Sequence, residues 1–448
     1  MDGIASYFKF AERGTSLGTE VRAGVTTFMV MVYIVALNGI IIAEPLGLDP
    51  VAVAAGTALV AGVMTIAMGL VTNYPFALAA GLGLNAAVAF GLTSPAIGMT
   101  PAQAMGVVVI EGVIITVLVV AGLREAIMEA IPLALKRAIG VGIGLFILFI
   151  GFWDGGLITG VGAPFDPVDF IFPNTPGAWV FLIGLLITAA LWVRKVKGAL
   201  IISIALTTVI AILLGVQKLP SSYSVTPDFS TLGLGLQDLG GVFTIEAGVL
   251  AAVLAIFTIM LSDFFDTMGT VTGIAAEAGL SDKDGQVPGV GRVLLVDGLA
   301  AAVGGAAGVS SNTTYIESAA GVADGGRTGM TSVVTGALFL VAIVLSPVVQ
   351  IIPLQAAAPA LVLVGYLMFT QIGEIDARDV STGFPALLIM ILMPLTFTIT
   401  IGIGAGIVVW VVLQIVAQRW GEIHWLMWIV FAAFLLYFAQ EVIKPLLG

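Results

Sequence analysis

The stretch "MLSDFFDTMGT", residues 260–270, places two carboxylates inside a long apolar segment. Between Glu246 and Glu277, Asp263 and Asp266 are the only charged side chains. At the rise of an α-helix they lie roughly 15–20 Å in from Glu277. A charged side chain at that depth in a membrane helix costs about 3 kcal/mol on insertion scales. The protein must gain something from both residues.

The composition is that of an integral membrane protein. Of 448 residues, 59% are hydrophobic and 10% are charged, with a mean hydropathy of +1.15. A soluble domain carries about 25% charged residues. The chain has no cysteine, which excludes disulfides, zinc–thiolate sites and Fe–S clusters. The net charge is −11 and no basic cluster is present, so we expect no nucleic-acid partner.

Apolar segments predict the membrane spans, and the length allows about 12–15 of them. The candidate spans cover residues 21–43, 51–72, 75–91, 101–122, 137–153, 177–193, 199–216, 246–274, 289–304, 307–322, 329–347, 357–371, 383–397 and 398–417. A further apolar stretch, 424–443, is either another span or an interfacial helix outside the functional core. With both ends of the spanning region cytoplasmic, the inner connections hold every Lys and Arg except Lys218 and Lys444. This bias predicts a multi-pass plasma-membrane protein with a cytoplasmic N-terminus.

Two candidate spans differ from the others in being short and rich in Gly, Ala and small polar residues. They are "YPFALAAGLGLNAAVAFGLTS" (Tyr74–Ser94) and "GGAAGVSSNTTYIESAAGVADGG" (Gly304–Gly326). They are third and tenth in order, so each is third in a set of seven. Such matched, interrupted segments indicate an inverted-repeat transporter and its binding site. Close helix packing also favours small residues, but packing alone does not account for Glu317.

The polar residues of these segments are the candidate site. Asp263 and Asp266 are spaced i, i+3 and project from one helical face. Glu317 follows two threonines and a tyrosine in the second interrupted segment, and Asn85 lies in the first. We expect no Lys or Arg nearby, and carboxylates without a cation in a low-dielectric surrounding tend to take up protons. Simpler roles also exist: Asp263 could cap a helix break and Asn85 could satisfy free backbone groups. His424 is interpreted as an interface residue.

Three stretches resemble a known family. "TNYPFALAAGLGLNAAVAF", "SDFFDTMGT" and "TTYIESAAGVADGGRTGMT" are similar to segments of the xanthine/uracil permease superfamily, specifically its adenine/guanine/hypoxanthine permease branch. The similarity extends to about Arg419. One departure is that Asn38 is followed by Gly39, where relatives usually carry Asn-Pro.

The resemblance implies an all-α polytopic membrane protein of about 14 helices in two inverted repeats of seven. Residues 1–122 and 246–347 would form a core domain, and residues 123–245 and 348–448 a gate domain with the C-terminal apolar segment. Spans 3 and 10 would be discontinuous, with short strands meeting at the centre.

The resemblance also implies roles for particular residues. Glu317 and Asp266 would hold a nucleobase, with Asp263, Asn85, Thr314 and Ile316 beside it. Glu317, Asp266 and Asp263 would couple uptake to protons.

The sequence therefore favours a transporter, not an enzyme, that imports adenine, guanine or hypoxanthine by proton symport with alternating access. It would need no cofactor or metal beyond the coupling H⁺. Its partners would be the purine and membrane lipid, with a homodimer as an option. An anion transporter of the same fold, of the sulfate or bicarbonate type, is the nearest alternative, and three buried carboxylates argue against it. An intramembrane aspartyl protease would need its acids on facing helices, and a passive channel would not need an acidic cluster.

Overall fold

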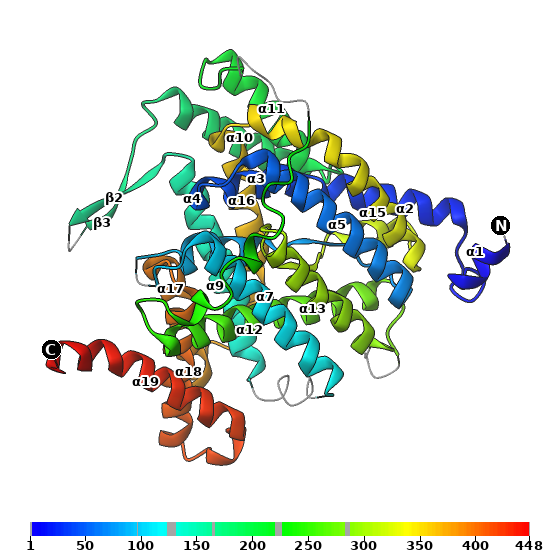
Figure 1. Ribbon diagram of the computed structural model, residues 1–448. Coiled ribbons are helices and arrows are strands. Elements are labelled where there is room, and N and C mark those ends of the chain that lie inside the picture. Colours follow the sequence, from blue (N-terminus) through cyan, green and yellow to red (C-terminus); the bar gives the residue numbers. More distant parts are fainter. Residues whose placement is uncertain are drawn as a thin grey trace.

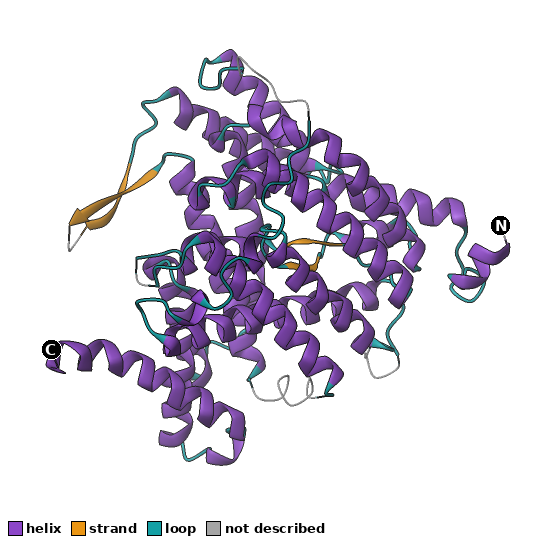
Figure 2. Cartoon of the chain, in the orientation of Figure 1, coloured by secondary structure: helices purple, strands orange, loops and turns teal. Residues whose placement is uncertain are grey.

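The computed structural model describes residues 2–95, 97–122, 131–163, 166–219, 226–282 and 287–447. The chain is almost entirely helical, as Figure 2 shows. The predicted apolar segments all coincide with helices or with strand–helix segments. The α-helices are α1 (Asp2–Tyr7), α2 (Leu17–Met31), α3 (Tyr33–Ile41), α4 (Ala43–Leu46), α5 (Pro50–Thr72), α6 (Leu82–Ala86), α7 (Pro101–Val120), α9 (Leu133–Asp154), α10 (Pro176–Val193), α11 (Ala199–Leu213), α12 (Val249–Glu277), α13 (Val290–Ala306), α14 (Ser318–Ala323), α15 (Gly329–Ala342), α16 (Leu354–Phe369), α17 (Val380–Thr396), α18 (Ile399–Val416) and α19 (Trp425–Leu447).

Shorter elements join these helices. The strands are β1 (Leu78–Ala80), β2 (Ile158–Ala163), β3 (Asp166–Phe170) and β4 (Asn312–Thr314). A π-helical segment, η1 (Ala87–Leu92), continues α6. The 3₁₀ segments are η2 (Leu234–Leu236), η3 (Gly241–Phe243), η4 (Ile343–Ile351), η5 (Thr370–Glu374) and η6 (Trp420–Glu422).

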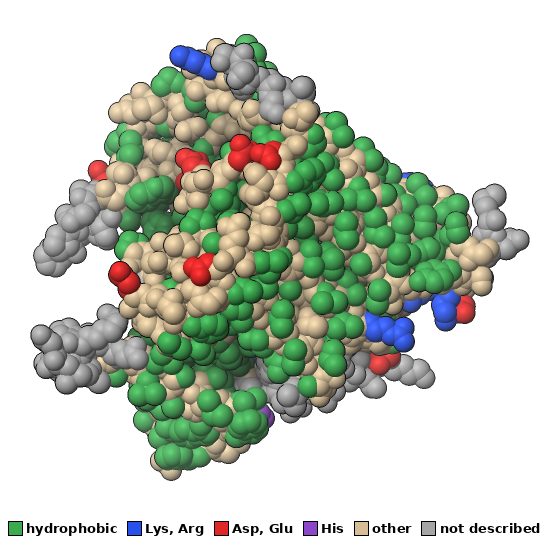
Figure 3. All heavy atoms as spheres, in the orientation of Figure 1, with side chains coloured by type: hydrophobic (Ala, Val, Ile, Leu, Met, Phe, Trp, Pro, Cys, Tyr) green, Lys and Arg blue, Asp and Glu red, His purple; other side chains and the backbone are tan. Residues whose placement is uncertain are grey.

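The described part of the chain contains 9 helices long and apolar enough to cross a membrane, counting continuous helical runs. Other apolar helices, such as α11 and α17, are shorter. Figure 3 shows the result on the surface, where hydrophobic side chains dominate and charged ones are few. The protein is a multi-pass membrane protein. Arg124 and Lys283, two of the predicted inner-loop cations, lie outside the described residues.

The two interrupted segments meet at the centre of the molecule. β1 and β4 pair antiparallel, with Leu78 opposite Thr314 and Ala80 opposite Asn312, and all their residues are buried. Each strand leads into a short helix, β1 into α6 and β4 into α14. Figure 2 shows this strand pair enclosed by helices. Three residues per strand are too few for independent stability, so the surrounding helices must hold the pair.

The helices pack in two groups. One contains α2, α5, α7, α13 and α15, with extensive contacts between α5 and α15 and between α7 and α13. The other contains α9, α10, α11, α16, α17 and α18. Small residues allow close approach in the first group: a Cβ on Gly329 would lie 2.0 Å from the carbonyl oxygen of Gly69. Any larger side chain there would force α5 and α15 apart.

Two peripheral elements complete the chain. β2 and β3 form a hairpin that projects from the helices in Figure 1. The C-terminal stretch predicted at 424–443 forms α19, which packs on α18 and α12.

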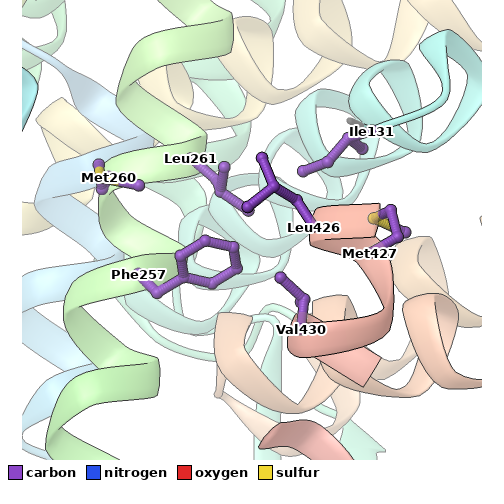
Figure 4. A pocket seen from close by; sticks show the side chains of 7 residues that line it. All are labelled: Ile131, Phe257, Met260, Leu261, Leu426, Met427 and Val430. Carbon is purple, nitrogen blue, oxygen red and sulfur yellow. The ribbon is translucent and has the colours of Figure 1, made fainter. Parts of the chain in front are cut away.

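A cavity of about 150 Å³ lies beside α19 and α12, lined only by apolar side chains (Figure 4). It has no polar group to orient a polar ligand and is separate from the candidate site.

Candidate functional site

Asp297 on α13 fixes the end of strand β4. Its Oδ1 accepts hydrogen bonds from Thr314 N at 2.9 Å and Thr314 Oγ1 at 2.8 Å. Its Oδ2 accepts one from Thr267 Oγ1 of α12 at 2.7 Å. Asp297 therefore ties three elements together. The hydroxyl of Thr314, a predicted binding residue, is already used in this network.

Three predicted site residues near the strand pair have accessible surface. Asp266 is exposed, Ile316 is 55% exposed and Glu317 is half-buried. α12 and α14, which bring Asp266 and Glu317 together, are in contact. Tyr33 Oη of α3 donates a 2.6 Å hydrogen bond to Glu317 Oε1. The structure thus places two carboxylates close together, with an apolar side chain next to one of them, and each of the three has accessible surface.

An exposed stripe runs along α12 from Asp266 toward Glu277. Asp266, Gly269, Gly273 and Ala276 recur at helical spacing and all are exposed. A Cβ built on Gly269 or Gly273 would meet no described atom within 4 Å. Because charged groups avoid lipid, this stripe is best read as an aqueous path to Asp266.

Asp263 does not share the surroundings of Asp266, although the i, i+3 spacing predicts one common face. Asp263 is fully buried and accepts a 2.8 Å hydrogen bond from Ser311 Oγ. The same hydroxyl lies 3.1 Å from Oε1 of Glu111 on α7. Residues three apart differ by about 60° around a helix, enough here to give one carboxylate an open space and the other a packed interior.

Asn85 is also fully buried. Its Nδ2 donates to Asn38 Oδ1 at 2.7 Å, and Asn38 in turn donates to Thr57 Oγ1 and to the carbonyl of Val309. Asn85 therefore links the interrupted segment to α3 and α5. Among described residues its Oδ1 has no partner.

Sequence reasoning missed several of these residues. Glu111 and Asp297 are isolated carboxylates in apolar helices, which is the signal that identified Asp263 and Asp266. Tyr33 gave no comparable signal. On this part of α12 a cation contacts a ring: Lys136 Nζ lies 4.7 Å from the ring centroid of Phe265. That contact does not contradict the expectation that no cation neutralises the carboxylates.

An ion pair links the α10–α11 connection to the end of α14, which packs on α2 of the first helix group. Lys197, in the α10–α11 connection, donates to both oxygens of Asp324 at 2.7 and 2.6 Å. Thr26 of α2 also donates to Asp324. These hydrogen bonds, that of Lys197 first, hold the pKa of Asp324 below its ordinary value.

Comparison with solved structures gives the fold. The transmembrane domain of a cyanobacterial bicarbonate transporter, BicA, superposes with a TM-score of 0.64 over 87% of this chain and 97% of that one, at 16% identity. At this identity the similarity shows the fold alone. The fold is that of a membrane transporter.

Sequence comparison gives the family. The model of a permease family (Xan_ur_permease) matches residues 18–429. The guanine/hypoxanthine permease PbuG of Bacillus subtilis is 36% identical, over 97% of this chain and 99% of its own. The adenine permease AdeQ of Escherichia coli is 37% identical, over 97% and 95%. The chain belongs to the xanthine/uracil permease superfamily, in its adenine and guanine/hypoxanthine permease branch, and the resemblance noted in the sequence is confirmed.

Proposed function

We propose that this protein imports a purine nucleobase, adenine, guanine or hypoxanthine, by proton symport. The names of its relatives support the substrate class. The observation that carries the proposal is the pair of accessible carboxylates, Asp266 and Glu317, beside the strand pair. A purine presents N–H donors on its edge, and a bond from such a donor to a carboxylate is among the stronger hydrogen bonds.

The arrangement around these acids fits a flat, neutral ligand. Ile316 offers an apolar surface beside Glu317, and Tyr33 fixes one oxygen of Glu317. Asn85 and Thr314 would act indirectly, through the network that holds the strands. An anionic substrate would meet two negative charges here, which disfavours the sulfate or bicarbonate alternative.

The carboxylates also supply the coupling. When a site alternates between two sides, a carboxylate that gains a proton outside and loses it inside ties substrate movement to the proton gradient. We assign this role to Glu317, Asp266 and Asp263, with no further cofactor.

Alternating access would arise from movement between the two helix groups. Residues 1–122 and 246–347 would form the moving core, and 123–245 and 348–448 the gate. In this assignment the exposed stripe below Asp266 is an inward-facing path, because the Glu277 end of α12 is the cytoplasmic one under the positive-inside rule.

The test is uptake of radiolabelled purines by proteoliposomes containing the purified protein. An inward proton gradient should drive accumulation of at least one of the three purines, and collapse of the gradient should abolish it. Uracil, xanthine, sulfate and bicarbonate should compete poorly. Accumulation that survives collapse and requires sodium would contradict the proton assignment.

A further inference from the structure

Glu111 and Asp263 form a pair of carboxylates buried beside Ser311, the residue before β4. Both residues are completely inaccessible to solvent. They come from different helices, α7 and α12, and their side chains lie within hydrogen-bonding reach of each other. Ser311 Oγ lies 3.1 Å from Glu111 Oε1 and 2.8 Å from Asp263 Oδ2.

The hydrogen count at Ser311 favours a proton on the pair. A serine hydroxyl carries one hydrogen, so it makes one full hydrogen bond to a carboxylate as donor. The other oxygen–oxygen contact becomes a full hydrogen bond if Glu111 or Asp263 carries a proton and donates it to Ser311 Oγ. Electrostatics lead to the same result, since two like charges in contact in a low-dielectric interior cannot both be ionised.

Two oxygens of the pair have no donor. Among described residues, nothing donates to Glu111 Oε2 or to Asp263 Oδ1. The neighbouring charges cannot compensate them: Asp297 on α13 and Asp266 on α12 are close enough to act on the pair and have the same sign. A buried acceptor without a donor is unfavourable. A further proton would neutralise the remaining negative charge of the pair and would supply the missing hydrogen-bond donor.

Glu20 shows what a structural buried carboxylate looks like in this protein. It is equally inaccessible, but both its oxygens are used, by Thr15, by the backbone N–H groups of Arg327, Thr328 and Thr331, and by the Thr331 hydroxyl. It holds the start of α15 and has no room for another donor. The Glu111–Asp263 pair, in contrast, has carboxylate oxygens without a hydrogen-bond donor among the described residues.

We propose that Glu111 and Asp263 form a proton-binding site that holds one shared proton at rest and takes up a second during each transport cycle. This inference rests on the proposed proton symport and assigns a place to the coupling proton. Loss of the last proton would leave two buried like charges, so the pair alternates between one and two protons. Glu111 thereby joins Asp263, Asp266 and Glu317 in coupling. Asp266 and Glu317 also hold the substrate.

The pair is connected to the strand pair by hydrogen bonds. Thr313 contacts Asp263, and its Oγ1 lies 2.6 Å from Thr267 Oγ1, which donates to Asp297. Ser311 and Thr313 both belong to the segment that leads to Glu317. Protonation of the pair therefore acts on the backbone that positions Glu317, without contact between the pair and the substrate.

The experiment compares wild type, Glu111→Gln and Asp263→Asn in proteoliposomes, with the exposed Glu12→Gln as a control. Two transport assays are needed: exchange of labelled against unlabelled purine without a gradient, and accumulation driven by an inward proton gradient. Glu111→Gln should keep exchange within about threefold of wild type, because no predicted substrate contact is removed, and both amide variants should lose accumulation. The control should keep both.

Infrared spectroscopy reports on the shared proton directly. Ordinary carboxyls ionise near pH 4, so a protonated-carboxyl band that persists at about pH 8 marks an unusual site. Wild type should show this band, and Glu111→Gln and Asp263→Asn should each weaken it. Its absence from wild type would overturn the proposal even if neither variant folds.

The outcomes distinguish failure of the proposed transport function from failure of the proposed proton-binding pair. If wild type accumulates no purine under a proton gradient, the proposed function fails and this inference fails with it. If wild type accumulates purine and both amide variants do so equally well, only the pair is wrong. Sodium-stimulated uptake in wild type that disappears in Glu111→Gln would mean that the pair binds sodium instead.

Discussion

Tyr33 donates a 2.6 Å hydrogen bond to Glu317, which lies 284 residues further along the chain. The bond connects α3 to the second interrupted segment. It fixes one oxygen of Glu317. Tyr33→Phe removes only the hydroxyl. We expect purine affinity to fall about tenfold, or about 1.4 kcal/mol, since hydrogen bonds to charged groups contribute on this scale.

The measurement is equilibrium binding by calorimetry, with the thermal midpoint of the protein as a check on folding. Tyr7→Phe is the matched control, because Tyr7 donates to Leu70 O at an exposed position away from the strands. Equal affinities for wild type and Tyr33→Phe would remove Tyr33 from the site.

Asp297→Asn should weaken both stability and transport. Asp297 accepts three hydrogen bonds, and an asparagine would turn its NH₂ group toward donors. A buried polar group left unsatisfied costs about 1–3 kcal/mol. A lower free energy of unfolding and reduced purine uptake should appear together, measured by thermal denaturation in detergent and by proteoliposome transport. An unchanged midpoint with normal uptake would show that the network is dispensable.

Lys197→Gln should change the rate of transport more than the affinity. The Lys197–Asp324 pair links the α10–α11 connection to the end of α14 and must break if they move apart. Partly exposed pairs contribute about 0–1 kcal/mol, so the maximal uptake rate should change by up to about fivefold while equilibrium binding stays constant. A change in binding with an unchanged rate would contradict this reading.

The same pair has a defined pH response. Because the pKa of Asp324 is lowered in the folded protein, its contribution to stability is present above the ordinary aspartate pKa and is lost as pH falls through the lower, folded value. Lys197→Gln should therefore leave the pH dependence of uptake unchanged from about pH 5 to 8, well above that window. A shift of the profile in Lys197→Gln would place a coupled titration there.

Water access along α12 can be tested with single cysteines, because the chain has none of its own. Ala276 is exposed on the stripe below Asp266, and its neighbour Ala275 is fully buried. An impermeant maleimide should modify Ala276→Cys from the cytoplasmic side and leave Ala275→Cys unmodified. Modification of Ala276→Cys from outside would contradict the proposed cytoplasmic water path along α12 and the cytoplasmic location of the Glu277 end of this helix.

Much of the fold can be predicted from the sequence because membrane helices must be long and apolar. The interrupted segments can be identified from their Gly-rich composition, and they contain the strand pair. What could not be predicted is which way each polar side chain turns. Asp263 and Asp266 share a helix, and their surroundings are decided by α7 and β4, which are distant in sequence.

Pairing across long separations also explains the residues that were missed. Glu111 becomes informative only beside Asp263, and Asn38 only beside Asn85. A single sequence shows isolated polar residues in apolar helices and does not show their partners. The accessible acids, Asp266 and Glu317, could be identified in advance because they lie in short motifs.

The central claim is that Glu317 binds the purine. The measurement that tests it most directly is purine affinity of purified Glu317→Gln by calorimetry, with gradient-driven uptake measured on the same preparation. The substitution keeps the size and one acceptor and removes the charge. We expect binding to weaken by about 1.5–3 kcal/mol and accumulation to be lost, with Glu12→Gln unaffected. Wild-type affinity together with wild-type accumulation in Glu317→Gln would contradict the claim.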